Sequence, residues 1–501
     1  MSNNSNLKII AASGMIWTSI SRFSAIGIRF ISGIVLARLL KPEDYGCIGM
    51  LSIFMVIAGS FVDCGFASAL IQKKRPTQED YSTIFFFNLA MSLLMYVILF
   101  LCAPAISRFY KISLLSSVLR VQGLVLIINA LSSIQINQLK KNFRFKKLTI
   151  VSLITSVTSL VICIFMAYKG FGVWALVSMN LATAIIPAVI FWGTNKWFPL
   201  LVFSKDSFRE LFKFGSFMFL SHLVNQFGSK LSQLMIGKIY SPAVLGYYTK
   251  ASSTENLASH SISSVLSQIT YPLYAEVQDD KVLLGNMIKR LTQTIAFITF
   301  PLLSLLMIIA KPIFLLLYSE RWLPSVPYFQ VLCFCGIAIC LQSINTQSIA
   351  AIGKSRAMFG WSLLKRSTGS TLVVGGLLLW GMKGLLAGCI LYTWFCYFVN
   401  IGLVSKYIGY KWQRQLLDLA PTFGAVFVIS LITYFSVWLL HLNNVYIDGL
   451  LKGIVFVLLF LGWSLIFKPD SYQYALSLVP SKFKFWERGK NGQYSKGTKN
   501  L

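Results

Sequence analysis

The sequence predicts an all-α integral membrane protein with about fourteen transmembrane helices, arranged as two six-helix lobes related by a parallel repeat and followed by two C-terminal helices. The first observation behind this prediction is composition: of 501 residues, 56% are hydrophobic and 12% are charged, and the mean hydropathy is +0.69. The second is an internal repeat of 200 residues. The third is the alternation of basic and charge-poor loops along the chain.

Apolar runs of roughly 20 residues, long enough to cross a membrane, recur from one end of the chain to the other. The expected spans begin near Ala11, Gly46, Tyr81, Ser113, Leu148, Phe171, Phe208, Gly246, Met287, Pro324, Ala357, Gly384, Leu416 and Val445. The first is too long and too basic for a cleavable signal peptide. The eighth, TKASSTENLASHSISSVLSQ, is so polar that only the repeat identifies it, and an amphipathic surface helix is its alternative.

The repeat relates LARLLKPEDYG, ending at Gly46, to LMIGKIYSPAVLG, ending at Gly246. A constant offset of 200 residues matches Arg38 with Lys238, Pro42 with Pro242 and Gly46 with Gly246. A helix, a Pro/Gly break and a return helix used once per half predict two lobes. We therefore expect an N-terminal lobe over 1–200, a second lobe over 201–408, helices thirteen and fourteen over 409–470 and a basic cytoplasmic tail over 471–501.

The net charge of +29 could indicate a nucleic-acid partner, but the distribution of the basic residues is better explained by membrane topology. Basic residues gather in alternate loops, such as KKR at 73–75 and KKNFRFKK at 140–147, and in the C-terminal tail. The intervening loops carry only scattered lysines and arginines. This positive-inside pattern predicts a multi-pass protein with both termini in the cytoplasm.

Covalent chemistry is not expected. The nine cysteines lie in or beside apolar segments without a CxxC pair, and the three histidines are far apart. We find no metal-ligand spacing, phosphate-binding glycine loop or nucleophile constellation, so the sequence predicts neither an enzyme nor a cofactor.

The string LARLLKPEDYG followed by GFASALIQKKRPTQEDYSTIFFFN resembles the polysaccharide transporters of the multidrug/oligosaccharidyl-lipid/polysaccharide flippase superfamily. FGSFMFLSHLVNQ, LMIGKIYSPAVLGYYTKAS and AAIGKSRAM extend the resemblance through the second half. The resemblance implies two bundles of six helices in a V-shaped, alternating-access arrangement, with two further helices. It also implies transport of undecaprenyl-pyrophosphate-linked sugars across the bacterial inner membrane. Relatives often have an Asp shortly before IGK, whereas this chain has Ser232, so coupling to H⁺ or Na⁺ stays open.

Cations inside spanning segments are the main functional candidates, because a charge in the bilayer interior is costly and faces protein or water. Arg22 and Arg29 share one face of the first helix, and an internal salt bridge is their alternative interpretation. A structural role explains Arg120 equally well. The candidate substrate-binding residues are Arg29, Arg22, His222, Lys230, Arg120, Lys365 and Arg366.

Two carboxylates, Asp63 and Glu255, are candidates for ion pairing or coupling. The first two helices are antiparallel, so residues at equal depth have numbers that sum to roughly 85, and the repeat carries this rule into the second half. The rule predicts ion pairs between Arg22 and Asp63 and between Lys230 and Glu255. It gives Arg29 no acidic partner, so we expect Arg29 to hold the pyrophosphate bidentately. The alternative is that Arg29 reaches a carbonyl group or a polar side chain.

These observations predict a flippase for lipid-linked oligosaccharide repeat units in O-antigen, capsule or exopolysaccharide synthesis, with a net-positive cavity bounded by the first, second, seventh and eighth spans. Its partners would be the lipid-linked oligosaccharide, membrane lipids, and polysaccharide polymerase and assembly proteins. A drug or metabolite exporter of the same fold is the alternative, which would favour buried carboxylates. A membrane glycan polymerase would need larger outside loops than this chain has.

Overall fold

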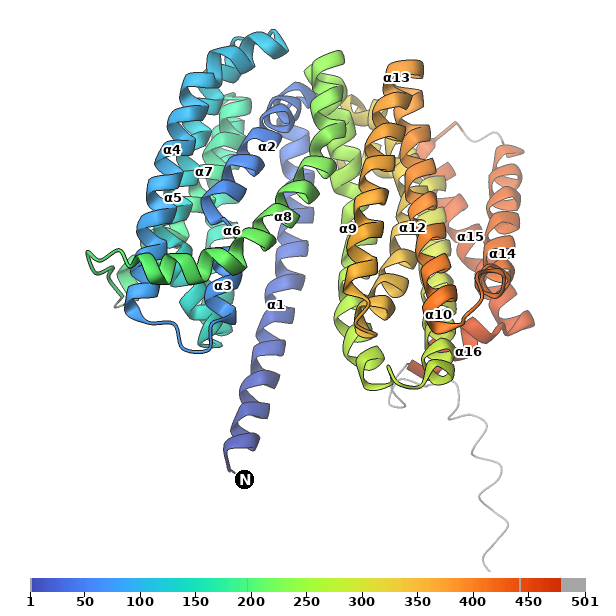
Figure 1. Ribbon diagram of the computed structural model, residues 1–501. Coiled ribbons are helices and arrows are strands. Elements are labelled where there is room, and N and C mark those ends of the chain that lie inside the picture. Colours follow the sequence, from blue (N-terminus) through green and yellow to red (C-terminus); the bar gives the residue numbers. More distant parts are fainter. Residues whose placement is uncertain (1, 196, 441–442, 479–501) are drawn as a thin grey trace, which may run out of the picture. The chain divides into compact units, whose positions relative to one another are not determined.

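The computed structural model describes residues 2–195, 197–440 and 443–478, which are helical through most of their length (Figure 1). In chain order the elements are α1 (Ser2–Leu39), α2 (Pro42–Asp63), α3 (Phe66–Gln72), α4 (Gln78–Tyr110), α5 (Leu114–Lys141), α6 (Phe145–Tyr168), α7 (Val173–Thr194), α8 (Lys205–Ile239), α9 (Pro242–Glu276), α10 (Lys281–Ile308), α11 (Ala310–Leu317), the 3₁₀ helix η1 (Glu320–Ser325), α12 (Val326–Ala351), α13 (Ser355–Ile408), α14 (Trp412–Trp438), α15 (Val445–Phe467) and α16 (Asp470–Leu478).

The all-α membrane fold predicted from the sequence is confirmed. Among the described residues, 11 helices are long and apolar enough to cross a membrane. One of them, within α13, is two helices joined at Trp380 and Gly381, where the backbone leaves the helical conformation. The polar helices α8 and α9 fall outside this set, although each is 35 residues long. Splitting α13 and including α8 and α9 is compatible with the fourteen spans expected.

Contacts divide the described chain into two compact units. Unit 1 contains α1 to α8, the first half of α9, and residues 314–328 and 373–385, and unit 2 contains the remaining described residues. Within unit 1, α4 packs on α5, α5 on α7, α7 on α6, and α6 on α1 (Figure 1). Within unit 2, α10 packs against α14, α15 and α16. The predicted division into lobes at residue 200 stays a prediction.

The two repeat-related corners touch each other reciprocally in unit 1. A Cβ atom on Gly46 would overlap the carbonyl group of Pro242, and a Cβ atom on Gly246 would overlap the carbonyl group of Pro42. Glycine is required at both positions because only a hydrogen atom fits against the opposing backbone. The 200-residue repeat therefore appears in space as a pair of equivalent contacts between the starts of α2 and α9.

The repeat-related cations Arg38 and Lys238 also have equivalent roles, because each binds carbonyl groups at the carboxyl end of a helix. Arg38 donates from Nε to the carbonyl oxygen of Leu317 at 3.1 Å and from a terminal nitrogen to that of Leu316. Lys238 donates to the carbonyl oxygen of Phe109 at 2.7 Å. A cation is favourable at this position since the last carbonyl groups of a helix lack intrahelical partners.

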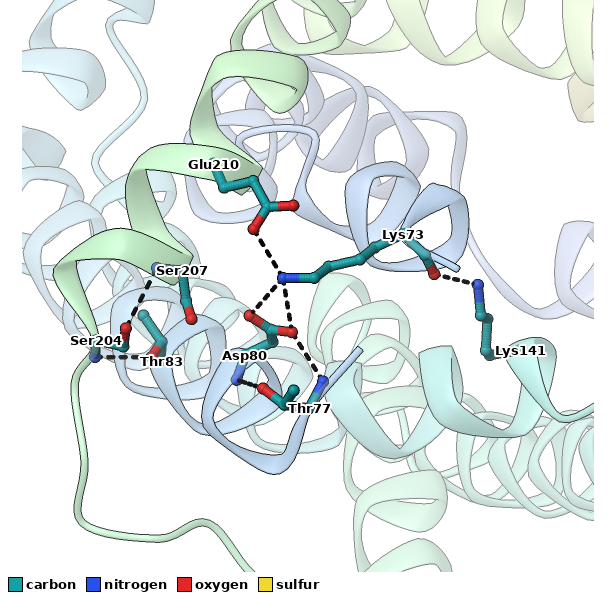
Figure 2. Close-up of polar contacts among 8 residues, drawn as sticks. All are labelled: Lys73, Thr77, Asp80, Thr83, Lys141, Ser204, Ser207 and Glu210. Carbon is teal, nitrogen blue, oxygen red and sulfur yellow. Dashed lines mark hydrogen bonds and ion pairs between the residues drawn. The ribbon is translucent and has the colours of Figure 1, made fainter. Parts of the chain in front are cut away.

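A polar cluster joins α3, α4, α5 and α8 in unit 1 (Figure 2). Lys73 forms ion pairs with Asp80 at 3.0 Å and Glu210 at 2.8 Å, and its own carbonyl oxygen accepts a hydrogen bond from Lys141 at 2.5 Å. Asp80 is 1% exposed and, with Thr77, forms the capping box at the start of α4. Partial burial acts to lower the pKa of Lys73, but its hydrogen bonds and charge contacts with Glu210 and Asp80 outweigh this and raise the pKa. The lysine therefore stays protonated.

The core of unit 2 is built from α9, α10, α12 and α13. Buried members from these four helices, in chain order, are Tyr274, Ile288, Ile344 and Val404. The predicted basic tail over 471–501 begins within α16, and its residues 479–501 lie outside the described part of the chain.

Candidate substrate cavity

Unit 1 contains a cavity of about 370 Å³ whose lining includes residues of α1, α2, α8 and α9, together with three residues of α7. The helical period places residues i, i+3 or i+4, and i+7 on one face, and this spacing recurs in the lining of three helices. The lining residues with this spacing are Arg29, Gly33 and Leu36 on α1, Tyr45, Gly49 and Ser52 on α2, and Lys250, Thr254 and Leu257 on α9. These are the helices predicted to bound the cavity, with additional contributions from α7 and Tyr318.

The cavity is positively charged. Its lining includes Arg29, Lys230 and Lys250, and none of the described residues that line it is an aspartate or a glutamate. The remaining walls are apolar or carry neutral polar groups such as Asn180 and Ser253. A cavity with three cations and no lining carboxylate favours an anionic ligand.

Lys250 is the most buried of the three cations, with 5% of its surface exposed. Its ammonium group donates to the carbonyl oxygen of Gly33 on α1 at 2.5 Å. It also lies 4.1 Å from the ring centre of Tyr318, 5.3 Å from that of Tyr45 and 5.5 Å from that of Trp322. Three aromatic faces around one ammonium group partly replace the water that a buried cation loses.

The aromatic cage around Lys250 is itself held in place. Trp322 is fully buried and donates from its indole nitrogen to the carbonyl oxygen of Ala37 at 2.7 Å. Tyr45 packs edge-on against Trp322 with ring centres 5.3 Å apart. The hydroxyl groups of Tyr318 and Thr254 are 3.0 Å apart. The position of Lys250 is therefore set by packing from α1, α2 and residues 314–328.

Lys230 and Arg29 lie in the same cavity with weaker restraints. Lys230 donates to the amide oxygen of Gln233 at 3.2 Å, and Ser52 donates to the same oxygen at 3.1 Å. Arg29 is exposed on α1, and in the described part of the chain its guanidinium group has no hydrogen bond or ion pair. Arg29 therefore keeps its donors available for a ligand.

Three other predicted site residues of unit 1 lie outside the cavity lining. Arg22 is half-buried on α1. The ring of His222 has Nδ1 3.3 Å from the hydroxyl oxygen of Ser60 and Nε2 3.2 Å from the amide nitrogen of Gln226. The guanidinium carbon of Arg120 lies 4.4 Å from the ring centre of Phe100.

Lys365 and Arg366 belong to unit 2, on α13. Lys365 donates to the amide oxygen of Asn400 at 2.8 Å, and Asn400 donates to Thr346 at 3.4 Å. Both cations are half-buried. Their contribution to substrate binding stays a prediction.

The predicted pairs Arg22–Asp63 and Lys230–Glu255 are not among the ion pairs of the described residues, which join Lys73 to Asp80 and Glu210, Lys289 to Asp418, and Lys452 to Asp448. Asp63 instead accepts a hydrogen bond from the backbone of Ala67 at 3.3 Å, which stabilises the turn into α3. Glu255 is 4% exposed on α9. Equal depth in the membrane therefore does not by itself pair Arg22 with Asp63, because two side chains must also face the same side.

Lys250 is the cavity residue that sequence reasoning missed. It lies eight residues beyond Pro242, hence about 12 Å along α9, which is far from the end of a spanning helix. That position, within a helix too polar to face lipid, was the signal that could have identified it.

A family model described as polysaccharide biosynthesis protein matches residues 35–327, more than half of the chain. The chain belongs to this family. Among the relatives of this polysaccharide biosynthesis protein is the teichuronic acid biosynthesis protein TuaB of Bacillus subtilis, which is 26% identical over 354 residues, or 70% of this chain and 73% of TuaB. Another is the lipopolysaccharide biosynthesis protein WzxC of Escherichia coli, 21% identical over 413 residues, or 81% of this chain and 83% of WzxC.

Solved structures place the polysaccharide biosynthesis protein in a known fold. The lipid II flippase MurJ in an inward closed conformation superimposes with a TM-score of 0.71 at 15% identity, covering 91% of this chain and 99% of MurJ. An inward-facing multidrug resistance transporter of the MATE family gives a TM-score of 0.61 at 14% identity, covering 79% of this chain and 98% of that one. At these identities the likeness concerns the fold alone.

Proposed function

We propose that the protein is a flippase that moves undecaprenyl-pyrophosphate-linked oligosaccharide repeat units across the bacterial inner membrane by alternating access. The product would supply O-antigen, capsule or exopolysaccharide synthesis. Membership of the polysaccharide biosynthesis family, the names of TuaB and WzxC, and the fold shared with MurJ support this proposal.

The observation that carries the proposal is the charge of the cavity in unit 1. A pyrophosphate head cannot cross hydrocarbon unaided, because an isolated charge in the bilayer interior is very costly. Arg29, Lys230 and Lys250 place three basic side chains where that head would pass, and none of the described lining residues is a carboxylate. Cations at such a site lower the barrier by replacing the water around the phosphates.

The three cations are suited to different parts of this task. Arg29 has a planar group with several donors. Since it has no hydrogen bond or ion pair with the described residues, it is available for bidentate binding of phosphate oxygens. Lys230 shares Gln233 with Ser52, so both can rearrange around a ligand. Lys250 is held between α1 and α9 by its hydrogen bond to Gly33, so its ammonium group keeps a fixed position in the cavity wall.

A drug exporter of the same fold is the second candidate, since the fold is also that of a multidrug transporter. Exporters of cationic compounds would favour a carboxylate in the cavity. The lining described here has the opposite charge, so this candidate is less well supported.

The proposal includes the finer features predicted from the sequence. Both termini would lie in the cytoplasm, the two lobes would move against each other, and polysaccharide polymerase and assembly proteins would act on the exported repeat unit. Reaction of single introduced cysteines with a membrane-impermeant reagent would test the topology.

Complementation of a flippase-deficient strain tests the function and the role of Arg29. Arg29→Ala at normal membrane abundance should abolish polymer export, because it removes the guanidinium group that is proposed to bind two phosphate oxygens. Arg29→Lys keeps the charge but cannot bind phosphate oxygens bidentately, so it should restore export in part. Full export by Arg29→Ala would contradict the proposed role.

A further inference from the structure

Unit 2 contains a separate basic cavity of about 700 Å³, formed by the start of α10 and the turn between α13 and α14. Four cations line it, Lys281, Lys289, Lys411 and Arg414, together with a single carboxylate, Asp418. The cavity shares no residue with the candidate substrate cavity. Its charge is thus unexplained by the function proposed above.

The turn that forms this cavity depends on Gly409. This residue ends α13 with φ of 93°, in the left-handed region that glycine adopts without strain. Lys411 follows as the N-cap of α14, where its side chain makes no capping hydrogen bond. At the start of α10, Asp280, which does not line the cavity, accepts hydrogen bonds from the backbone of Val282 and Leu283.

The single carboxylate of the cavity is already satisfied. Asp418 accepts from Lys289 at 2.8 Å through one oxygen and from the hydroxyl group of Tyr410 at 2.6 Å through the other. Within the described chain, the side chains of Lys281, Lys411 and Arg414 make no hydrogen bond or ion pair. Three cations that share a cavity without counter-charges favour an anionic ligand.

An apolar groove of about 620 Å³ adjoins the basic cavity, and the two share Leu417 and Asp418. Beyond these residues the groove runs between α14 and α15, where Val428, Trp463 and Phe467 line it. It ends at the start of α16, which contributes the polar residues Asp470 and Ser471. A soluble anion would use only the basic cavity. A ligand that combines an anionic head with a hydrocarbon chain would use both.

The groove also holds an unpartnered polar atom. Gln293 is 6% exposed and lines the groove, and its amide oxygen has no hydrogen-bond partner among the described residues. It lies one helical turn along α10 from Lys289, which lines the basic cavity. A hydroxyl group of a lipid headgroup would satisfy this buried acceptor.

We propose that the basic cavity and the apolar groove together bind one anionic phospholipid of the surrounding membrane. The phosphate lies among Lys281, Lys411 and Arg414, and one acyl chain lies in the groove between α14 and α15. Basic pockets between transmembrane helices at the membrane surface recognise anionic headgroups in this way. The ligand is a component of the membrane and is distinct from the transported substrate.

Lipid titration of the purified full chain, followed by native mass spectrometry, tests this site. The probes are dioleoyl phosphatidylglycerol, dioleoyl phosphatidylcholine and inorganic phosphate. The head variant is Lys281→Gln/Lys411→Gln/Arg414→Gln. Its matched control is Lys74→Gln/Lys111→Gln/Lys213→Gln, which removes the same charge from three exposed lysines of unit 1. Gly424→Leu fills the groove, where an added Cβ atom meets no atom within 4 Å.

The wild-type chain should retain one phosphatidylglycerol more tightly than phosphatidylcholine, and millimolar phosphate should not displace it. The head variant should bind phosphatidylglycerol about a hundredfold more weakly, as expected for three lost cations, whereas the control triple keeps wild-type affinity. Gly424→Leu should also weaken lipid binding. Thermal unfolding of each lipid-free variant verifies that it is folded.

Equal binding of the two lipids, or equal losses in the head and control variants, would overturn the proposal. Displacement of the lipid by inorganic phosphate would identify a soluble anion as the ligand and would also overturn it. Unchanged lipid binding by folded Gly424→Leu would show that the acyl chain does not lie in the groove.

Discussion

At the residue scale, the properties of Lys250 illustrate how a charge is kept inside a membrane protein. Its burial would be unfavourable alone, and the carbonyl oxygen of Gly33 with three aromatic faces compensates. Arg29 on the facing helix has no comparable partner in the described chain. One cation is therefore fixed by the protein, and the other is left available.

We predict that Lys250→Met folds but loses most transport. Methionine retains the length and apolar character needed to fill the aromatic cage, so packing changes little. The cavity nevertheless loses one of its three cations. Polymer export at matched membrane abundance is the measurement, with Lys169→Met as the control for a lysine outside the cavity. Wild-type export by Lys250→Met would show that its charge is dispensable.

At the residue level, the sequence singled out two cations that line one cavity, and their role in substrate binding stays a prediction. Arg29 and Lys230 were identified because a charge in an apolar helix is conspicuous. Lys250 was missed because it lies in the central part of α9, residues 249–268, which is rich in Ser, Thr and Asn. The pairs assigned to Asp63 and Glu255 rested on depth alone, and depth along two helices does not specify their rotation about their axes.

At the element scale, the Pro/Gly corners that start α2 and α9 are the point where the repeat has structural consequences. Gly46 packs against the backbone of Pro242, and Gly246 packs against that of Pro42. Because neither glycine has a Cβ atom, the two helix starts can approach at backbone distance. The sequence revealed the repeat through the matched Pro and Gly residues. It could not reveal that the two copies touch, because contact depends on how the helices pack.

We predict that Gly46→Ala destabilises the structure by about 1–3 kcal/mol, because the added methyl group must displace the backbone of α9. Gly246→Ala should have a similar effect through the equivalent contact with α2. Gly193→Ala is the control, since its added Cβ atom meets no atom within 4 Å. Thermal unfolding in detergent measures all three. Equal unfolding temperatures for Gly46→Ala and Gly193→Ala would refute the close contact.

The cluster around Lys73 gives a second prediction at this scale. Lys73→Met leaves Asp80 buried without its counter-charge, which should lower the free energy of unfolding by about 1–3 kcal/mol, less than for a fully buried pair because Lys73 is 22% exposed. Lys74→Met is the control at the adjacent exposed position. Denaturation monitored by circular dichroism should separate them, and identical curves would show that the pair contributes nothing.

At the scale of the whole molecule, the chain combines a membrane fold shared with MurJ, membership of a family of polysaccharide biosynthesis proteins and a cavity with three cations. Composition and hydropathy were sufficient to predict an all-α membrane protein, because the bilayer leaves few ways to satisfy the backbone. They could not predict the cavity walls, which require the rotation of each helix and the return of residues 314–328 to α1 and α2.

The most direct test of the central claim is transport in proteoliposomes that contain a fluorescent polyprenyl-pyrophosphate-linked oligosaccharide, with a quencher added to one side. With the wild-type chain, the quencher should abolish the fluorescence of the whole labelled pool. The variant Arg29→Gln/Lys230→Gln/Lys250→Gln, folded and inserted to the same level, should leave about half of it protected. Equal transport by the wild-type chain and the triple variant, or none by the wild-type chain under conditions where it moves a cationic amphiphile, would contradict the account.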